Sequence, residues 1–416
     1  MSKKLTLTIL SGVAASGLGA LSLPADVEAA DHISIHHMNF EEYGDKVKAG
    51  DNIVSIEKNF GLDWTLTAEL GYDTVSGASP AWGPTTPVSG SQDALNRAQK
   101  TQVAQENTTE VIRAGYDPYR NGYLVQAYEL EDTRYSTSAN LIYRDKKRDE
   151  WSLGINYGQE EDYKSVGING QVLIYADSRK NRSYTIGSAL LFDKTLSFQE
   201  YKDFGNAQEW QDIFNGDIEL SLSQIFTSNF YATLTLFTGY KSGYLSNHYL
   251  TVQREIDIDG NGTIANDEVF LAQDTRPDKR LSGGINIQTF YSVSSAVVIR
   301  PRYKYFSDDW GVSSHQIGGK LSIELLDWLT FTPGYFWYTQ TAADFFVDPS
   351  AADPSFAATG YATSDLRLGD FNTNAYELGI SVQASKRLRF NALAAYYDRS
   401  NGYESQWWVV GATYEF

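Results

Sequence analysis

Apolar and polar residues alternate along most of this chain, in segments of about ten residues separated by turn residues, a pattern typical of transmembrane β-strands. One face of each segment is apolar or aromatic, as lipid contact requires, and the other is small or polar. We count sixteen such segments and predict sixteen strands. The clearest apolar faces are Trp64, Leu66, Ala68, Leu70 and Tyr72; Trp151, Leu153, Ile155 and Tyr157; Val166, Ile168, Gly170, Val172 and Ile174; and Leu281, Gly283, Ile285 and Ile287.

The last segment places an aromatic or apolar residue at every second position up to Phe416. A terminal strand of this kind is typical of outer-membrane barrels, and we expect the barrel-assembly machinery to recognise it. The predicted fold is therefore all-β, a transmembrane antiparallel up-and-down β-barrel of about sixteen strands. An even strand number puts the N- and C-termini on one side, the periplasmic side. A soluble β-sandwich would also alternate, but it would not need the aromatic end.

Residues 1–29 have the form of a signal peptide, with Lys3 and Lys4 before an apolar stretch and an A-x-A-like cleavage site at its end. We expect its removal, which leaves residues 30–416 as a barrel in the cell outer membrane. An uncleaved membrane anchor is the weaker alternative, because the stretch is rich in Gly, Ser and Ala. No later window approaches about 18 consecutive apolar residues, so only a closed barrel could span the bilayer.

Loop lengths assign the two sides of the predicted barrel, because such barrels have short periplasmic turns and longer outer loops. Short and long links alternate regularly along the chain. The long links are residues 78–132, 195–215, 242–279 and 341–372. Residues 78–132 are long enough to form either an outer loop or a plug inside the lumen.

Composition narrows the choice of partners. The 28 Tyr, 20 Phe and 9 Trp suit aromatic girdles at the two membrane interfaces, with outer-membrane lipid between them. The absence of cysteine excludes thiol chemistry and covalently attached haem. The net charge is −18, and it is unchanged after cleavage because Lys3 and Lys4 are balanced by Asp26 and Glu28. This acidity argues against nucleic acid as a partner.

One segment, residues 257–268, matches the calcium-binding loop of an EF-hand at every demanding position. Gly262 permits the sharp central turn, and Ala265 at position 9 implies a water ligand. Carboxylate and carbonyl oxygens at these spacings suit Ca2+, which prefers oxygen ligands. The expected protein ligands are the side chains of Asp257, Asp259, Asn261 and Glu268 and the backbone carbonyl of Thr263.

The two helices that flank an EF-hand loop are missing from the pattern. Residues 249–255 look extended or irregular, and residues 269–274 are too short for a helix. We therefore expect a calcium-stapled outer loop rather than a sensor that opens, with an affinity of ~10⁻⁴ to 10⁻³ M, as in extracellular sites. The alternative is a solvated acidic turn whose spacing arises by chance.

A second candidate site is a basic ladder, Arg300, Arg302 and Lys304, whose members alternate with Ile299, Pro301 and Tyr303. If the apolar set faces lipid, the three cations line one interior wall. Two outcomes remain open: a water-filled passage with a transverse field, or a lumen closed by ion pairing, since buried charges require partners. Candidate opposing carboxylates are Glu69, Asp73, Asp217, Glu219, Glu324 and Glu377, and Lys320 and Arg389 could belong to either arrangement.

The five histidines do not form a catalytic set. His32, His36 and His37 lie at the start of the mature chain, His248 lies in the calcium-motif loop, and His315 is expected on the lipid side of the twelfth strand. None has a nucleophile at a recognisable spacing, although His36 and His37 could bind a transition metal weakly. We therefore expect no enzymatic activity.

Short stretches resemble a known family. Residues 60–64, 72–80, 131–134 and 163–169, together with the closing strand, are similar to domain of unknown function 3570, a family of exported proteins expected to be barrels. The resemblance implies fold and location, and it supplies no catalytic residues.

The sequence thus favours an outer-membrane barrel that passes or exports small polar solutes through a charged lumen, with one extracellular calcium site. The alternative is a closed barrel whose calcium-ordered loops bind a surface or exported partner protein. An enzyme is the third and weakest hypothesis.

Overall fold

The computed structural model describes residues 31–43, 47–84, 123–198, 208–247, 250–264, 268–351 and 353–416. The predicted signal peptide, residues 1–29, and most of the predicted loop or plug within 78–132 lie outside these ranges. No helix in the described part of the chain is long and apolar enough to cross a membrane.

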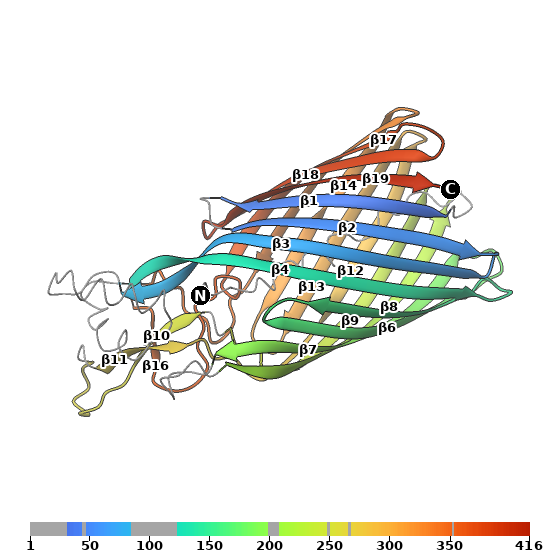
Figure 1. Ribbon diagram of the computed structural model, residues 1–416. Coiled ribbons are helices and arrows are strands. Elements are labelled where there is room, and N and C mark those ends of the chain that lie inside the picture. Colours follow the sequence, from blue (N-terminus) through green and yellow to red (C-terminus); the bar gives the residue numbers. More distant parts are fainter. Residues whose placement is uncertain are drawn as a thin grey trace.

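Sixteen antiparallel strands close into one barrel, because the first strand pairs with the last (Figure 1). This confirms the predicted fold class and strand number. The barrel strands are β1 (His32–Glu42), β2 (Val47–Phe60), β3 (Trp64–Pro84), β4 (Tyr123–Arg144), β5 (Glu150–Gln159), β6 (Tyr163–Tyr175), β7 (Arg182–Phe198), β8 (Gln208–Thr227), β9 (Phe230–Gly243), β12 (Lys279–Ser294), β13 (Val297–Asp308), β14 (Ser313–Leu326), β15 (Leu329–Gln340), β17 (Phe371–Gln383), β18 (Leu388–Arg399) and β19 (Glu404–Glu415).

A small second sheet lies beyond one end of the barrel. It consists of β10 (Thr251–Glu255), β11 (Val269–Gln273) and β16 (Ser355–Ala357), in the order β11-β10-β16. β10 and β11 come from the connection between β9 and β12, and β16 comes from the connection between β15 and β17. The sheet therefore joins two connections that leave different parts of the barrel rim.

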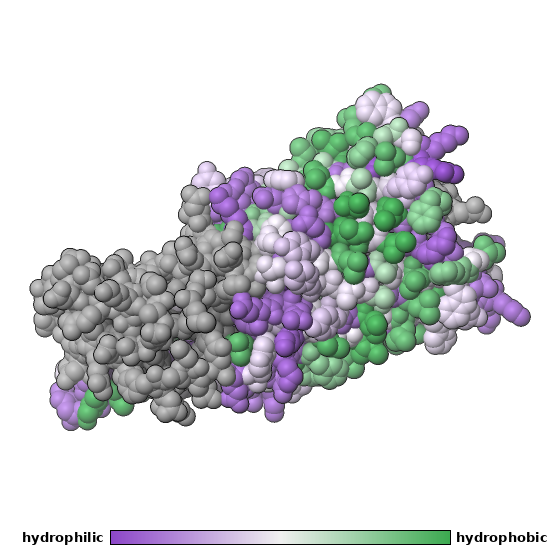
Figure 2. Space-filling model, viewed as in Figure 1, coloured by the Kyte–Doolittle hydropathy of each residue, from purple (hydrophilic) through white to green (hydrophobic). Residues whose placement is uncertain are grey.

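The alternation along each strand separates a lipid-facing surface from the lumen. On β5, Ile155 is 62% exposed on the outer surface. Its neighbour Gly154 faces inward, where a Cβ atom would meet the side chain of Asn169 at 2.7 Å. The Asn169 side chain thus lies against the inner wall, over the glycine of the neighbouring strand. Figure 2 shows the apolar band on the outer face, which is what a lipid environment requires.

The two ends of the barrel differ in their connections (Figure 1). At the short-turn end, where Phe416 lies, the links between successive strands are short, for example residues 228–229 between β8 and β9. At the long-loop end the links include residues 244–278 and 341–370. Which end faces the periplasm stays a prediction, drawn from the usual distribution of short and long loops.

Some strands run further than the sequence pattern suggested. β3 continues to Pro84 and β4 begins at Tyr123, so both extend into the segment 78–132 assigned to a loop or plug. In the same way β7 and β8 take up most of the segment 195–215. Polar strand extensions beyond the membrane carry no lipid-facing alternation, which is why their ends could not be located from periodicity.

Hydrophobic cores of the described residues lie at the long-loop end rather than inside the barrel. One contains Trp310, Val312, Ala343 and Leu368, and the other contains Val252, Ala272 and Ala362. We call the three-stranded sheet together with these two clusters the outer domain. Its buried apolar side chains give it a folded interior of its own.

Candidate functional site

The predicted calcium motif forms the tip of a β-hairpin. β10 and β11 pair from Thr251 with Gln273 to Glu255 with Val269, and the Ile256 amide donates to the Glu268 carbonyl at 2.9 Å. Strands thus stand on both sides of the loop where an EF-hand has helices. This geometry is that of a closed hairpin tip, which cannot open as a helix pair does.

Three of the five predicted ligands converge in this tip. Carboxylate oxygens of Asp257, Asp259 and Glu268 lie within 4.8 Å of one another. The Gly262 amide donates to Asp257 at 2.9 Å and is the main reason why the pKa of Asp257 lies below its ordinary value. Gly262 has a φ of 80°, the left-handed conformation that the turn requires.

The other two predicted ligands adjoin the cluster. The Asn261 side-chain amide donates to Asp259 at 2.6 Å, and its oxygen accepts the Thr263 amide at 2.7 Å. The Ile258 amide donates to Glu268 at 2.7 Å. Oxygen-rich donors with this net negative charge fit a hard cation such as Ca2+. Ala265, the position expected to bind through water, lies outside the described residues.

Arg254 fastens the hairpin to the connection that carries β16. Its guanidinium is buried and donates to the carbonyls of Ala357 and Gly360, both at 2.8 Å, and to the Thr275 hydroxyl. Nothing in the sequence pattern marked Arg254, because its two carbonyl acceptors lie 103 and 106 residues away along the chain.

A buried ion network forms a second tie between the same two connections. Arg276 donates to Asp274 at 2.7 Å and to Asp365 at 2.9 Å, and Arg367 also donates to Asp365. Burial raises the pKa of Asp274 in spite of Arg276. Burial also acts on Asp365, but Arg367 and Arg276 outweigh it and lower the pKa of that carboxyl.

The outer domain reaches across the barrel mouth. β10 belongs to the connection after β9, yet it contacts β3, which lies six strands from β9 around the wall (Figure 1). The hairpin with the acidic tip is thus tied to both sides of the rim.

The three predicted lumen cations share the inner face of β13. The Arg300 guanidinium lies 4.7 Å from the Phe290 ring, Arg302 donates to the Asn286 oxygen at 3.1 Å, and the Lys304 ammonium lies 5.1 Å from the Phe237 ring. Within the described part of the chain, none of the three cations forms an ion pair. The nearby Lys320 differs, since it pairs with Glu377 at 2.6 Å.

The wall opposite the ladder is acidic. β3 is eight strands from β13 in either direction around the sixteen-stranded barrel, and its inner face carries Glu69 and Asp73. Asp73 pairs with Arg134, whereas Glu69 is exposed although it faces inward. Glu219 is also an exposed inner residue, but it lies on β8, only three strands from β13. Within the described part of the chain, these two inward-facing carboxylates are therefore not covered by neighbouring side chains.

The other predicted residues occupy structural positions. Arg389 donates to Gln383 at 2.8 Å, and His37 shares a hydrogen bond with Asn52 on the outer face. His36 faces inward next to Gly411. His315 lies on the lipid side of the twelfth barrel strand, hydrogen-bonded to Tyr303. His248 lies outside the described residues.

Three solved structures with a similar arrangement are distant in sequence. A bacterial polysaccharide outer membrane secretin is 9% identical, with a TM-score of 0.46 over 94% of this chain and 100% of the other. The CymD monoaromatic hydrocarbon channel is 9% identical, with a TM-score of 0.38 over 93% of this chain and 88% of the other. The siderophore receptor PirA from Acinetobacter baumannii is 9% identical, with a TM-score of 0.39 over 90% of this chain, which spans only 53% of the receptor.

A search of curated protein sequences finds no match. The sequence model described as "Protein of unknown function (DUF3570)" matches residues 5–416, which is nearly the whole chain and confirms the resemblance seen in the short motifs. The chain belongs to the DUF3570 family.

Proposed function

We propose that this protein is an outer-membrane pore through which small polar solutes pass, selected by the charges of its lumen. The observation that carries the proposal is the ladder Arg300, Arg302 and Lys304 on β13, without carboxylate partners among the described residues and eight strands from the acidic wall. The proposal includes export by a cleaved signal peptide, assembly through the C-terminal strand, and both termini in the periplasm.

The charge separation gives the lumen a transverse field. Cations on one side and carboxylates on the other orient a polar solute as it enters. A solute without a dipole or charge gains no such orientation and passes more slowly. The interaction energy of two unit charges about 4 Å apart is ~4 kcal/mol at an effective dielectric constant of about 20. Even a fraction of that energy changes ion selectivity measurably, because ~1.4 kcal/mol corresponds to about a tenfold change in an equilibrium ratio.

The experiment is reversal-potential measurement on the pore in a planar bilayer under a salt gradient. Arg300→Glu with Arg302→Glu should shift the permeability ratio toward cations by about tenfold. The matched control is Lys164→Glu with Arg182→Glu, which makes the same charge change on outward-facing positions. Equal reversal potentials for both double variants and the native protein would remove the ladder from the conduction path.

The proposal assigns Ca2+ to the tip of the β10–β11 hairpin. Bound there, the ion would neutralise the clustered carboxylates of Asp257, Asp259 and Glu268, with Asn261 and the Thr263 carbonyl completing the oxygen shell. Because the hairpin is part of the outer domain, a stiffer tip would stiffen the structure that lies beyond the barrel mouth.

The alternative function is a closed barrel that displays the outer domain to a surface or exported protein. The contact of β10 with β3 favours it, since this contact places folded structure over the mouth. A display barrel would conduct little, yet it would lose partner binding when Glu268→Gln weakens calcium coordination. Conductance therefore separates the two functions.

A further inference from the structure

The hydrogen-bonded wall is interrupted on both sides of one hairpin, β13–β14. The β12–β13 ladder lacks the pair Thr289–Pro301, and the β14–β15 ladder lacks the pair Leu321–Pro333; each gap includes one adjoining pair. Between β13 and β14 the pairing is continuous. The other described ladders show no such gap inside their length, so this hairpin differs from its neighbours at both of its outer edges.

Proline explains both interruptions. It has no N–H to donate, so the carbonyls of Thr289 and Leu321 lose the ladder donors that face them. Proline is normally confined to sheet edges and bulges, and an unpaired carbonyl is costly in the membrane. Pro301 and Pro333 lie in the middle of their strands. Departures of this kind from local rules concentrate at functional sites.

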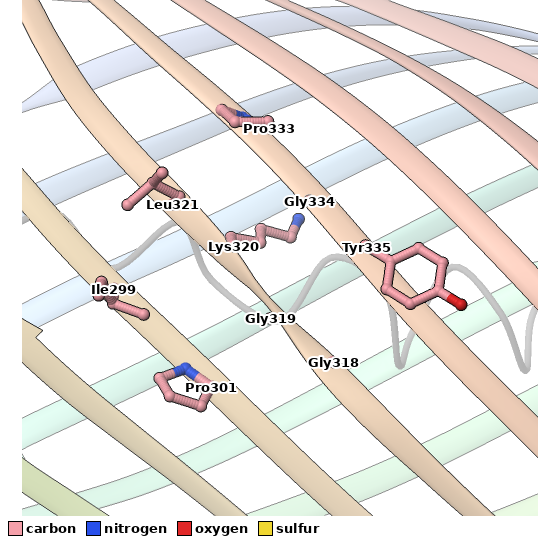
Figure 3. A pocket seen from close by; sticks show the side chains of 9 residues that line it. All are labelled: Ile299, Pro301, Gly318, Gly319, Lys320, Leu321, Pro333, Gly334 and Tyr335. Carbon is pink, nitrogen blue, oxygen red and sulfur yellow. The ribbon is translucent and has the colours of Figure 1, made fainter.

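The lipid-facing surface is hollowed at the same place. Figure 3 shows Ile299 and Pro301 on one strand and Pro333 and Tyr335 two strands away, with Gly319 between them. The groove is open to the outside and has a volume of about 440 Å³. Its side chains are mainly apolar, and its position in the lipid-facing band makes a hydrocarbon chain the matching occupant.

Glycines form the floor of the groove, and inner side chains cover them: Phe336 lies over Gly318, and the ion pair of Lys320 with Glu377 lies over Gly334. A Cβ atom on Gly319 would meet the Arg300 carbonyl at 2.6 Å, and one on Gly318 would collide with the Tyr335 carbonyl. Directly behind, on the inner face of the same hairpin, stand Arg300 and Arg302. An anionic group is the natural partner for these two cations, which form no ion pair among the described residues.

We propose that the β13–β14 hairpin is a lateral port, through which a single-chain anionic amphiphile such as a long-chain carboxylate passes between bilayer and lumen. The chain occupies the outer groove, and the carboxylate moves inward to Arg300 and Arg302 when the hairpin parts from β12 or β15 at the proline gaps. This proposal does not depend on passage of polar solutes through the two ends.

The test uses the full-length mature protein in liposomes that contain a long-chain carboxylate with a diazirine at its methyl end. After illumination, labelled residues are identified by mass spectrometry. The key variant is Pro301→Ala with Pro333→Ala, which returns the two missing N–H donors. The matched control is Ile155→Ala with Ile287→Ala, which changes two lipid-facing residues and no ladder donor.

The native protein and the control should be labelled in the groove, at Ile299, Leu321 or Tyr335, and inside the lumen, at Phe290 or Phe336. The proline variant should keep the groove label and lose the lumen label. The uncharged alcohol of the same chain length should label the groove only. Three outcomes would overturn the port. The first is labelling spread evenly around the barrel, and the second is an unchanged lumen label in the proline variant. The third is equal labelling of the lumen by the alcohol and the carboxylate. If the double variant does not fold, each single replacement, which restores one donor, must lower the lumen label.

Discussion

Arg276 and Asp365 form a buried ion pair at 2.9 Å that joins two connections 89 residues apart in the chain. Together with Asp274 and Arg367, the pair fixes the outer domain above the barrel mouth. Besides this network, the two connections are held together by the pairing of β10 with β16, by the Arg254 hydrogen bonds and by the cluster of Val252, Ala272 and Ala362. The stability of the outer domain should therefore depend on this network.

Replacement of Arg276 should loosen the outer domain and leave the barrel intact. Arg276→Met removes one partner of a buried pair and leaves Asp274 without its cation, a change that costs about 3–5 kcal/mol. Limited proteolysis should then cleave residues 244–278 or 341–370 at protease concentrations that spare the native protein. Arg182→Met, at the exposed short-turn end, serves as the control. Identical cleavage of both variants would show that the network does not hold the domain.

Acidification should release the outer domain through Asp365. Its folded-state pKa lies below the ordinary value of 3.8, so its contribution to stability is complete above about pH 4 and disappears as the pH falls through the folded value. Asp274 has a raised pKa, so its protonation does not destabilise the folded state. The release is measured as sensitivity to cleavage by pepsin between about pH 5 and about pH 2. The Asp365→Asn variant should be cleaved by pepsin at every pH in this range. If cleavage of the native protein does not change with pH, Asp365 does not control the release.

Calcium should bind once, at the hairpin tip. Calorimetry on the refolded protein should show one saturable site with an affinity of ~10⁻⁴ to 10⁻³ M. Asp257→Ala should abolish the heat, whereas Asp348→Ala, an exposed acid on another loop, should not. The absence of heat in the native protein would end the calcium assignment.

Removal of the terminal aromatic residue should impair assembly more than stability. Phe416 is half exposed on the lipid side, and its amide donates to the Asp31 carbonyl, so its deletion removes little buried surface. The amount of barrel in the outer membrane should fall, while refolded protein should keep its thermal midpoint. Unchanged membrane levels would exclude the C-terminal residue as an assembly signal.

The sequence was most informative where the environment is most uniform. Lipid on one side and a polar lumen on the other force a period of two, so the strand number and the inner position of Arg300, Arg302 and Lys304 could be predicted from alternation alone. The oxygen spacing of residues 257–268 similarly located the acidic tip, because those ligands are close neighbours in the chain.

Contacts between distant segments could not be predicted in this way. Arg254 and Arg276 look like ordinary surface charges in the sequence, and their burial depends on how two long connections fold together. The two wall prolines were visible in the sequence, but their effect depends on which neighbouring strand each missing N–H would face. That information exists only in the register.

Single-channel conductance of the refolded mature protein in a planar bilayer, recorded with calcium and then with a chelator, tests the central claim most directly. We expect steady openings in both conditions, with more frequent closures or altered conductance after chelation, since the acidic hairpin belongs to the outer domain at the barrel mouth. Silence in both conditions, from protein shown to be folded, would contradict a pore and favour the display barrel.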